Sequence, residues 1–476
     1  MMKRFSIALL LLLLVPPAFA QGEYRSVYDD FKRHAVSSFD DFTRDIRDKW
    51  ERFILQEGLE RNRKLPVDSL PEPASERPHA GKQLRVSEIM HVVDYALPQV
   101  TEAAGWFKNG EPDTSGLRRL SFDYYGAPQQ FLIPSALGQD HPAGITEEAV
   151  EAYWKNLARM DVSGILAECR RRRNEAGYND WALLLWVQQL AHAACPQDVC
   201  SECTMMTVYI LNRLGLMARM ARVENRLTIL FAARQKVYGR QYVVLDTYPY
   251  YLADPSIMTD AVYTYGNAAT RHARPLDLRI SEPVRLGDSA RKVVHKPSSV
   301  FGEMLSVPVN MSLMAFYSHY PQLEAREYAL SQPDPDFKAA IVAALRPLLE
   351  GGEDVEAVNR LLAFLQKDFD YQVDVEQFGY EKPFFPEENF IYPYNDCEDR
   401  AVLLSFLTWN LLNKKMVLLD YEDHLAAAVC LEGNLKGDYV KIGGERYYVC
   451  DPSYINATVG MSMPQYRNRA VRVWVL

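Results

Sequence analysis

Apolar side chains recur every three or four residues across residues 24–53, which matches the α-helical repeat of about 3.6 residues per turn. The other positions of this segment hold mostly Asp, Arg and Lys. The pattern predicts a long amphipathic helix that packs on the body of the protein, because a membrane-surface helix would carry a more uniformly basic polar face. Residues 65–83 follow with four prolines and few apolar side chains, and they predict a linker.

The end of the chain shows helical and strand-like patterns in a clear order. The predicted elements are helix 337–349, helix 355–367, a loop rich in Pro, Tyr and Phe at 371–394, a helix from 396 or 397 to about 412, strand 425–431 and strand 447–450. Gly443 and Gly444 provide the turn before the last strand. Helices followed by antiparallel strands predict an α+β fold.

The first twenty residues have the features of a cleaved secretory signal. Two basic residues precede an apolar run at 7–15, and Ala-Phe-Ala at 18–20 matches the small-x-small ending that signal peptidase cleaves. The apolar run is too short to span a bilayer, and no later segment predicts a transmembrane span. We therefore expect an exported protein, periplasmic or secreted, whose mature chain begins near Gln21.

The remaining chain is too long for one hydrophobic core, so two or three domains are expected. Two proline-marked boundaries divide it, near residues 65–83 and near Pro297. The predicted organisation is a signal peptide at 1–20, the amphipathic helix and linker at 21–83, one domain at 84–298 and a second domain at 299–476.

Charge and cysteine content narrow the classes of function. The chain has 62 acidic and 53 basic residues, a net charge of −9, which argues against a nucleic-acid partner. It also has seven cysteines. Export favours disulfides, and an odd number leaves at least one thiol unpaired if the others bridge within the chain. Such a thiol is a candidate nucleophile.

Cys397 lies where a helix start would favour a thiolate, since free N–H groups and the helix dipole stabilise negative charge there. His424 begins one predicted strand, and Asp451 ends a later one. If these strands pair antiparallel, the imidazole meets the carboxylate and both can face the helix start. Cys397, His424 and Asp451 then form a nucleophile, a general base and an orienting acid. In this register Cys430 and Cys450 stay apart as two buried thiols.

This order of Cys on a helix, His at a strand start and Asp before Pro at a strand end resembles the transglutaminase-like superfamily, with its papain-like fold. The segment Asp-Cys-Glu-Asp at 396–399 is similar to that of the bacterial transglutaminase-like cysteine proteinases. The resemblance covers roughly the last 100 to 140 residues. It implies that the Cys397 backbone N–H is one oxyanion donor. Candidates for the second donor are Gln372, Tyr392 and Tyr394.

Three carboxylates flank the candidate nucleophile: Asp396, Glu398 and Asp399. Capping of the helix start explains all three. Carboxylates beside a thiol nevertheless oppose its ionisation, and a bound cation would cancel that penalty. Oxygen ligands of this kind suit calcium, and the resemblance includes calcium-dependent exported relatives. Both interpretations stay open, with no other cofactor required.

The middle of the chain repeats the pattern in a damaged form. Cys203 opens a helix, Arg226 stands where the histidine should be, and Asp246 ends a strand-like segment. Arginine cannot accept the thiol proton at neutral pH. The domain at 84–298 is therefore predicted to share the fold, lack catalysis and serve binding or packing.

A rival interpretation of the same region is a zinc site. The spacing of four soft ligands supports it, and they are His192, Cys195, Cys200 and Cys203. In an exported chain, a small disulfide loop between Cys195 and Cys200 is a further alternative.

The sequence therefore predicts an exported cysteine peptidase or amidase that acts on a protein or peptide substrate through a thioester acyl-enzyme. Transglutaminase activity is a variant of the same chemistry, because water or an amine can accept the acyl group. The alternative function is a non-catalytic binding or assembly protein that retains the fold. Reactivity of the Cys397 thiol distinguishes the two.

Overall fold

The computed structural model describes residues 91–97, 107–108, 111–112, 116–142, 144–195, 200–266, 273–288, 290–421, 423–467 and 469–476. The chain divides into two compact units, residues 1–70 and 71–476, and every described residue belongs to the second. The predicted signal peptide, long helix and linker at 1–83 lie outside the described residues. The described part contains both helices and antiparallel sheets, so the prediction of an α+β fold is confirmed.

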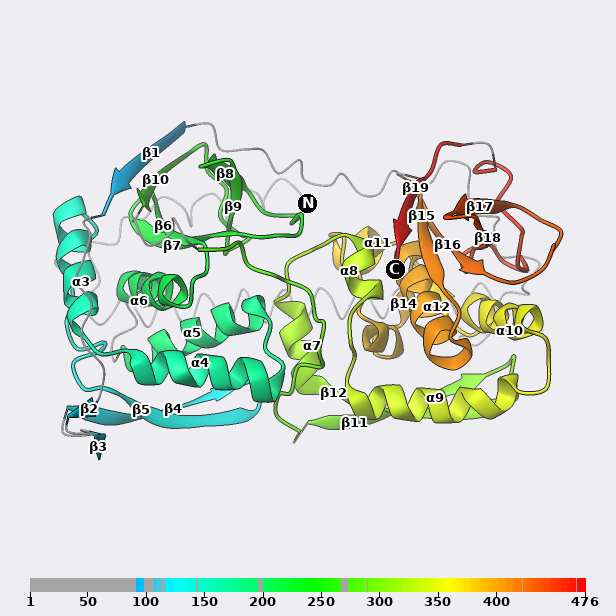
Figure 1. The fold of residues 1–476 in the computed structure, drawn as a ribbon, viewed down its shortest axis with the longest axis horizontal. Helices are drawn as coiled ribbons and strands as arrows, with labels where there is room; N and C mark the ends of the chain where they lie inside the picture. The colour runs from blue at the N-terminus through cyan, green and yellow to red at the C-terminus, as the bar shows by residue number, and fades with distance from the viewer. Residues whose placement is uncertain are drawn as a thin grey trace, which may run out of the picture. The chain divides into compact units, whose positions relative to one another are not determined.

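The amino-terminal half of the described chain packs helices between a hairpin and a larger sheet (Figure 1). Its strands are β1 (His91–Ala96), β2 (Phe107–Lys108), β3 (Glu111–Pro112), β4 (Leu117–Tyr124), β5 (Ala127–Pro134), β6 (Ala218–Val223), β7 (Arg226–Ala232), β8 (Tyr242–Leu245), β9 (Tyr248–Leu252) and β10 (Ala261–Gly266). Its helices are α3 (Glu147–Arg159), α4 (Ser163–Ala176), α5 (Asp180–Ala194) and α6 (Cys200–Arg213). The larger sheet has the order β1-β10-β6-β7-β9-β8.

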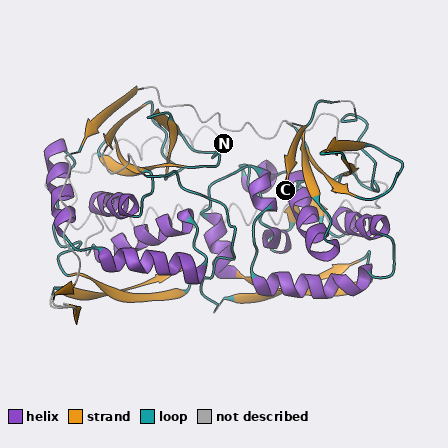
Figure 2. Ribbon diagram, in the orientation of Figure 1, coloured by secondary structure: helices purple, strands orange, loops and turns teal. Residues whose placement is uncertain are grey.

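The carboxy-terminal half has the same layering (Figure 2). Its strands are β11 (Arg291–Ser298), β12 (Glu303–Asn310), β13 (Asp370–Tyr371), β14 (Tyr394–Asn395), β15 (Met416–Asp420), β16 (Leu425–Cys430), β17 (Tyr439–Ile442), β18 (Glu445–Cys450) and β19 (Arg472–Val475). Its helices are α7 (Met311–Ser318), α8 (Ala325–Ala329), α9 (Pro335–Leu349), α10 (Asp354–Lys367), α11 (Asp374–Phe378), the 3-10 helix η3 (Pro386–Phe390) and α12 (Cys397–Leu412). The larger sheet has the order β17-β18-β16-β15-β19.

The two larger sheets agree strand for strand. Reading β10-β6-β7-β9-β8 beside β19-β15-β16-β18-β17 pairs each strand with a counterpart, and every neighbouring pair in both series is antiparallel. Only β1, which pairs parallel with β10, has no partner in this comparison. The predicted domain boundary at residue 298 falls between the paired strands β11 and β12.

Helix α12 begins at Cys397, as predicted. Asp396 accepts the backbone N–H groups of Glu398 and Asp399, and Asp399 accepts the N–H of Asp396, which closes a capping box. Most side chains along the helix are buried, and it packs against α8, α10 and β16. The helix that begins at Cys397 therefore belongs to the core.

The pairing of β16 with β18 is antiparallel and places Cys430 opposite Tyr447. This register differs by two residues from the prediction, because His424 precedes β16 and Asp451 follows β18, so neither belongs to the ladder. A shift of two residues leaves every side chain on its predicted face. Cys430 and Cys450 are separate thiols, as expected, but only Cys450 is buried, and Cys430 is partly exposed.

Candidate active site

Cys397 is the first residue of α12 and is 8% exposed. The backbone N–H groups of the first helical turn have no carbonyl partner within the helix, and the helix dipole adds positive potential at this end. Both effects favour the thiolate over the thiol. The residue therefore lies in a position suited to a nucleophile.

His424 and Asp451 form a buried pair beside this thiol. The Nε2 atom of His424 lies 2.7 Å from Oδ2 of Asp451, and both side chains are almost fully buried. Burial lowers the pKa of His424, but the charge and hydrogen bond of Asp451, together with a hydrogen bond to Cys397, raise this pKa to about 10. Since Nε2 is occupied by Asp451, Nδ1 is the nitrogen available to the thiol. The structure thus brings together the three residues predicted from the sequence.

Backbone contacts fix the carboxylate of Asp451. Its Oδ1 accepts the N–H of Ser453 at 2.9 Å, and its backbone carbonyl accepts Nε2 of Gln366 at 3.3 Å. The ring of Tyr466 stacks on His424, with centroids 4.8 Å apart and planes 22° apart. The stacked ring of Tyr466 restricts rotation of the imidazole further than the carboxylate of Asp451 would by itself. Sequence reasoning missed Tyr466, which has no motif around it.

Arg400 joins the segments that carry the triad. This buried side chain donates from Nε to Oδ1 of Asn395 at 2.8 Å, from Nη2 to the carbonyl of Phe369 at 2.7 Å and from Nη1 to the carbonyl of Pro452 at 3.4 Å. Burial lowers the pKa of Arg400 to about 10. The guanidinium therefore links the strand before α12 with the residue after Asp451. In the sequence, Arg400 is recognisable as a charged residue within a largely apolar predicted helix, and this signal could have identified it.

A group of acidic side chains lies against the same helix start. Carboxylate oxygens of Asp374, Glu381, Asp396 and Glu398 all lie within 4.8 Å of one another. Asp399, predicted as a third calcium ligand, lies outside this group, because backbone N–H groups of Phe384 and Asp396 occupy its two oxygens. Asp374, the first residue of α11, and Glu381, just after this short helix, were missed, since the sequence pattern predicts only a loop there and does not reveal its course.

The electrostatics of this acidic group match a cation site. Burial and the charge of Asp396 raise the pKa of Asp374 to about 9 and that of Glu381 to about 7. Asp374 is 1% exposed; its Oδ2 accepts the N–H of Lys382 at 2.6 Å, whereas its Oδ1 has no hydrogen-bond partner. A divalent ion would satisfy that atom and offset the mutual repulsion of the carboxylates.

The candidates for the second oxyanion donor occupy different surroundings. The backbone N–H of Gln372 donates to the carbonyl of Asn395, two residues before Cys397, while its side chain donates to Glu376. Tyr392 stacks on Phe384 with centroids 4.9 Å apart, within the loop. Tyr394 belongs to β14 and is 38% exposed. Gln372 thus follows β13 directly and Tyr394 belongs to its partner strand β14, which ends two residues before Cys397.

In the amino-terminal half, Asp254 lies in a position similar to that of Asp451. In the sheet order β9 takes the place of β18; it ends at Leu252, and Asp254 lies two residues beyond it. Asp246 lies in the turn between β8 and β9, so the predicted match of Asp246 with Asp451 is wrong. Asp246 instead forms an ion pair with Arg219 at 2.5 Å. Arg226 begins β7 and lies 3.9 Å from Asp254, and His424 likewise adjoins the start of β16 and pairs with Asp451.

Cys203 is a buried residue in the first turns of α6, and its thiol is hydrogen-bonded to that of Cys195, which lowers the pKa of Cys195. His192 is exposed. Among the described side chains, the acidic group beside Cys397 is the one set of three or more residues placed to hold a metal ion. The side chain of Cys200 lies outside the described residues.

Comparison with models of known families and with curated proteins finds no match to this chain. Within the described residues, no helix has the length and apolar character needed to cross a membrane. What the protein does is therefore inferred from its own residues.

Proposed function

We propose that the chain is an exported cysteine-dependent amide hydrolase of the transglutaminase-like kind, acting on a protein or peptide substrate. One observation carries this proposal: a buried His424–Asp451 pair, 2.7 Å apart, adjoins a cysteine at the first turn of a core helix. A pKa of about 10 for His424 means that the ring is protonated at neutral pH and can pair with the thiolate of Cys397.

Catalysis follows from these positions. The Cys397 thiolate attacks the amide carbonyl carbon, and its own backbone N–H donates to the resulting oxyanion. His424 gives its proton to the leaving amine, which breaks the C–N bond and leaves a thioester. Neutral His424 then takes a proton from water, which attacks the thioester and releases the acid and the thiolate. An amine in place of water would give transamidation. Asp451 keeps the ring oriented throughout.

Calcium is the cation that we propose for the acidic group. Asp374, Glu381, Asp396 and Glu398 would hold it, since hard divalent ions prefer carboxylate oxygens. Its charge would offset the carboxylates that oppose ionisation of the neighbouring thiol. The unpartnered Oδ1 of Asp374 supports this assignment.

We further infer a papain-like core present in two copies. The strand-for-strand agreement of the two larger sheets supports the duplication, as does the recurrence of Asp-Pro-Ser at 254–256 and 451–453. The amino-terminal copy has Arg226 in place of the base and is proposed to be non-catalytic.

The decisive experiment is the alkylation rate of Cys397 by iodoacetamide against pH, followed by peptide mass spectrometry. Wild type is compared with His424→Ala, and Cys430 in the same molecule is the control thiol. We expect fast alkylation of Cys397 at pH 6 in wild type and a loss of at least about tenfold in the variant. If Cys397 reacts like Cys430 in both proteins, with and without calcium, the enzyme is rejected in favour of a binding protein.

A further inference from the structure

A pocket of about 540 Å³ lies in the amino-terminal half, away from the residues of the proposed triad in sequence. It is formed by the end of α4, the turn into α5, Arg234 just after β7 and the segment at 274–282. The lining residues are Arg173, Asn174, Gly177, Tyr178, Asn179, Asp180, Arg234, Arg274, Asp277, Arg279, Ser281 and Glu282. Four of the twelve are arginines, on a chain whose net charge is −9.

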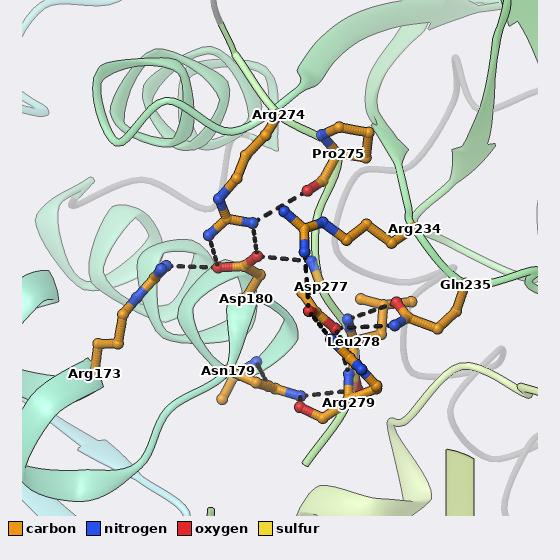
Figure 3. A network of polar contacts seen from close by, with 11 residues as sticks. Arg173, Asn179, Asp180, Arg234, Gln235, Arg274, Pro275, Asp277, Leu278 and Arg279 are labelled. Atoms are coloured by element: carbon orange, nitrogen blue, oxygen red, sulfur yellow. Dashed lines mark hydrogen bonds and ion pairs between the residues drawn. The ribbon is translucent and has the colours of Figure 1, made fainter. Parts of the chain in front are cut away.

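Asp180 holds two of these arginines in place. Its carboxylate is 2% exposed and accepts Nη2 of Arg173 at 2.5 Å and both terminal nitrogens of Arg274 at 2.5 and 3.1 Å. It also accepts the backbone N–H of Asp277 at 2.7 Å. Figure 3 shows Arg173 and Arg274 reaching this carboxylate from different elements. Both oxygens of Asp180 are thus fully used.

Asp277 contacts the other two arginines, Arg234 and Arg279 (Figure 3). Arg279 donates to it from Nε at 3.1 Å and from Nη2 at 2.8 Å, and Gln235 donates at 2.9 Å. Arg234 makes one long contact to Asp277, of 3.5 Å. Burial would raise the pKa of Asp277, but the hydrogen bonds from Arg279 and Gln235 lower it to about 2, so this carboxylate is charged above that pH.

The pocket therefore offers hydrogen-bond donors rather than acceptors. A guanidinium has five N–H groups, and the contacts above use one from Arg173 and one from Arg234. If Asp180, Asp277 and Glu282 are all charged, the lining has four cationic and three anionic side chains. An ordinary network of surface ion pairs contributes little to stability and does not require a cavity beside it. Here the buried carboxylate of Asp180 orients Arg173 and Arg274, and the partly buried carboxylate of Asp277 orients Arg279. The arginines are thus arranged around a cavity, which suits a planar or tetrahedral oxyanion.

We propose that this pocket binds a small molecule through an oxyanion, carboxylate or phosphate, held chiefly by Arg234 and Arg279. These two side chains are 50% and 47% exposed and keep most of their donors available. The site is independent of the triad and gives the amino-terminal half a binding role of its own.

The test is calorimetric titration of the full chain with inorganic pyrophosphate and, separately, with citrate, at constant ionic strength. We expect saturable binding of at least one anion. The Arg234→Gln/Arg279→Gln double variant should weaken it at least tenfold. Arg285→Gln removes the same charge from an exposed position outside the lining and should change affinity less than twofold. The single variant Arg234→Gln tests the same point if the double variant folds poorly.

Preference for pyrophosphate assigns the ligand to phosphate compounds, and preference for citrate assigns it to carboxylic acids; either supports the site. No saturable binding of either anion overturns it. Equal weakening by Arg285→Gln and the double variant also overturns it, because that result would show only screening of surface charge.

Discussion

Asp254, two residues after β9, and Asp451, directly after β18, each accept the backbone N–H of the serine two residues later at 2.9 Å. The Asp-Pro-Ser segment thus makes the same local contact in both halves. The difference lies in the facing residue, which is Arg226 at 3.9 Å in one half and His424 at 2.7 Å in the other. A guanidinium can pair with the carboxylate but cannot move a proton at neutral pH.

We therefore predict that Arg226→Ala leaves the alkylation rate of Cys397 within twofold of wild type, while Asp451→Asn lowers it by about tenfold or more. Asp451 supports the protonated ring, whereas Arg226 belongs to a pair without a base. The measurement is the rate at pH 6 by peptide mass spectrometry. Equal effects of the two substitutions would refute the assignment of catalysis to the carboxy-terminal half alone.

The error over Asp246 has a physical cause. The sequence fits a strand that ends in aspartate at two places, Leu245-Asp246 and Ala253-Asp254. The tight turn that joins β8 to β9 has no clear signal in the sequence. Only the sheet order shows that β9 pairs with β7. Local patterns decide where strands lie, but long-range pairing decides which strands correspond.

Arg400→Met is predicted to destabilise the fold by about 3 kcal/mol, because it leaves three buried oxygens, on Asn395, Phe369 and Pro452, without their donor. Thermal and urea unfolding measure this. Arg360→Gln, at an exposed position on α10, should stay within about 0.5 kcal/mol of wild type. Similar stability of the two variants would show that Arg400 does not join these segments.

The predictable parts of the candidate site are those encoded locally. The start of α12 follows from Asp396 and the apolar run after it, and the positions of His424 and Asp451 follow from strand limits. Asp374 and Glu381 could not be found in this way, because they reach Asp396 only through the folding of a long loop.

Glu387 predicts a pH dependence of stability. This side chain is fully buried, its Oε1 accepts the N–H of Asp334 at 2.7 Å, and its Oε2 has no partner. Burial raises the pKa of Glu387 from 4.5 to about 8. The folded state therefore holds a proton that the unfolded state releases, and stability falls by about 1.4 kcal/mol per pH unit between these two values.

Glu387→Gln removes this penalty, so its melting temperature should exceed that of wild type by a margin that grows from pH 5 to pH 8 and then levels off. Glu350→Gln, at an exposed position, is the control and should show no such trend. A margin that is constant across this pH range would mean that Glu387 does not retain its proton in the folded protein.

Calcium is predicted to stabilise the chain through the acidic group. At a concentration one hundred times the dissociation constant, binding to the folded state alone adds about 2.7 kcal/mol. Asp374→Asn should remove most of the resulting rise in melting temperature, since Asp374 contributes a buried, unpartnered oxygen. Glu376→Gln changes an exposed carboxylate on the same helix, outside the group, and should preserve the rise. Magnesium is a useful second ion, because it demands a tighter octahedral site and should stabilise less. If calcium raises the melting temperature of wild type and Asp374→Asn equally, or of neither, the four carboxylates hold no ion, and protonation must relieve their repulsion instead.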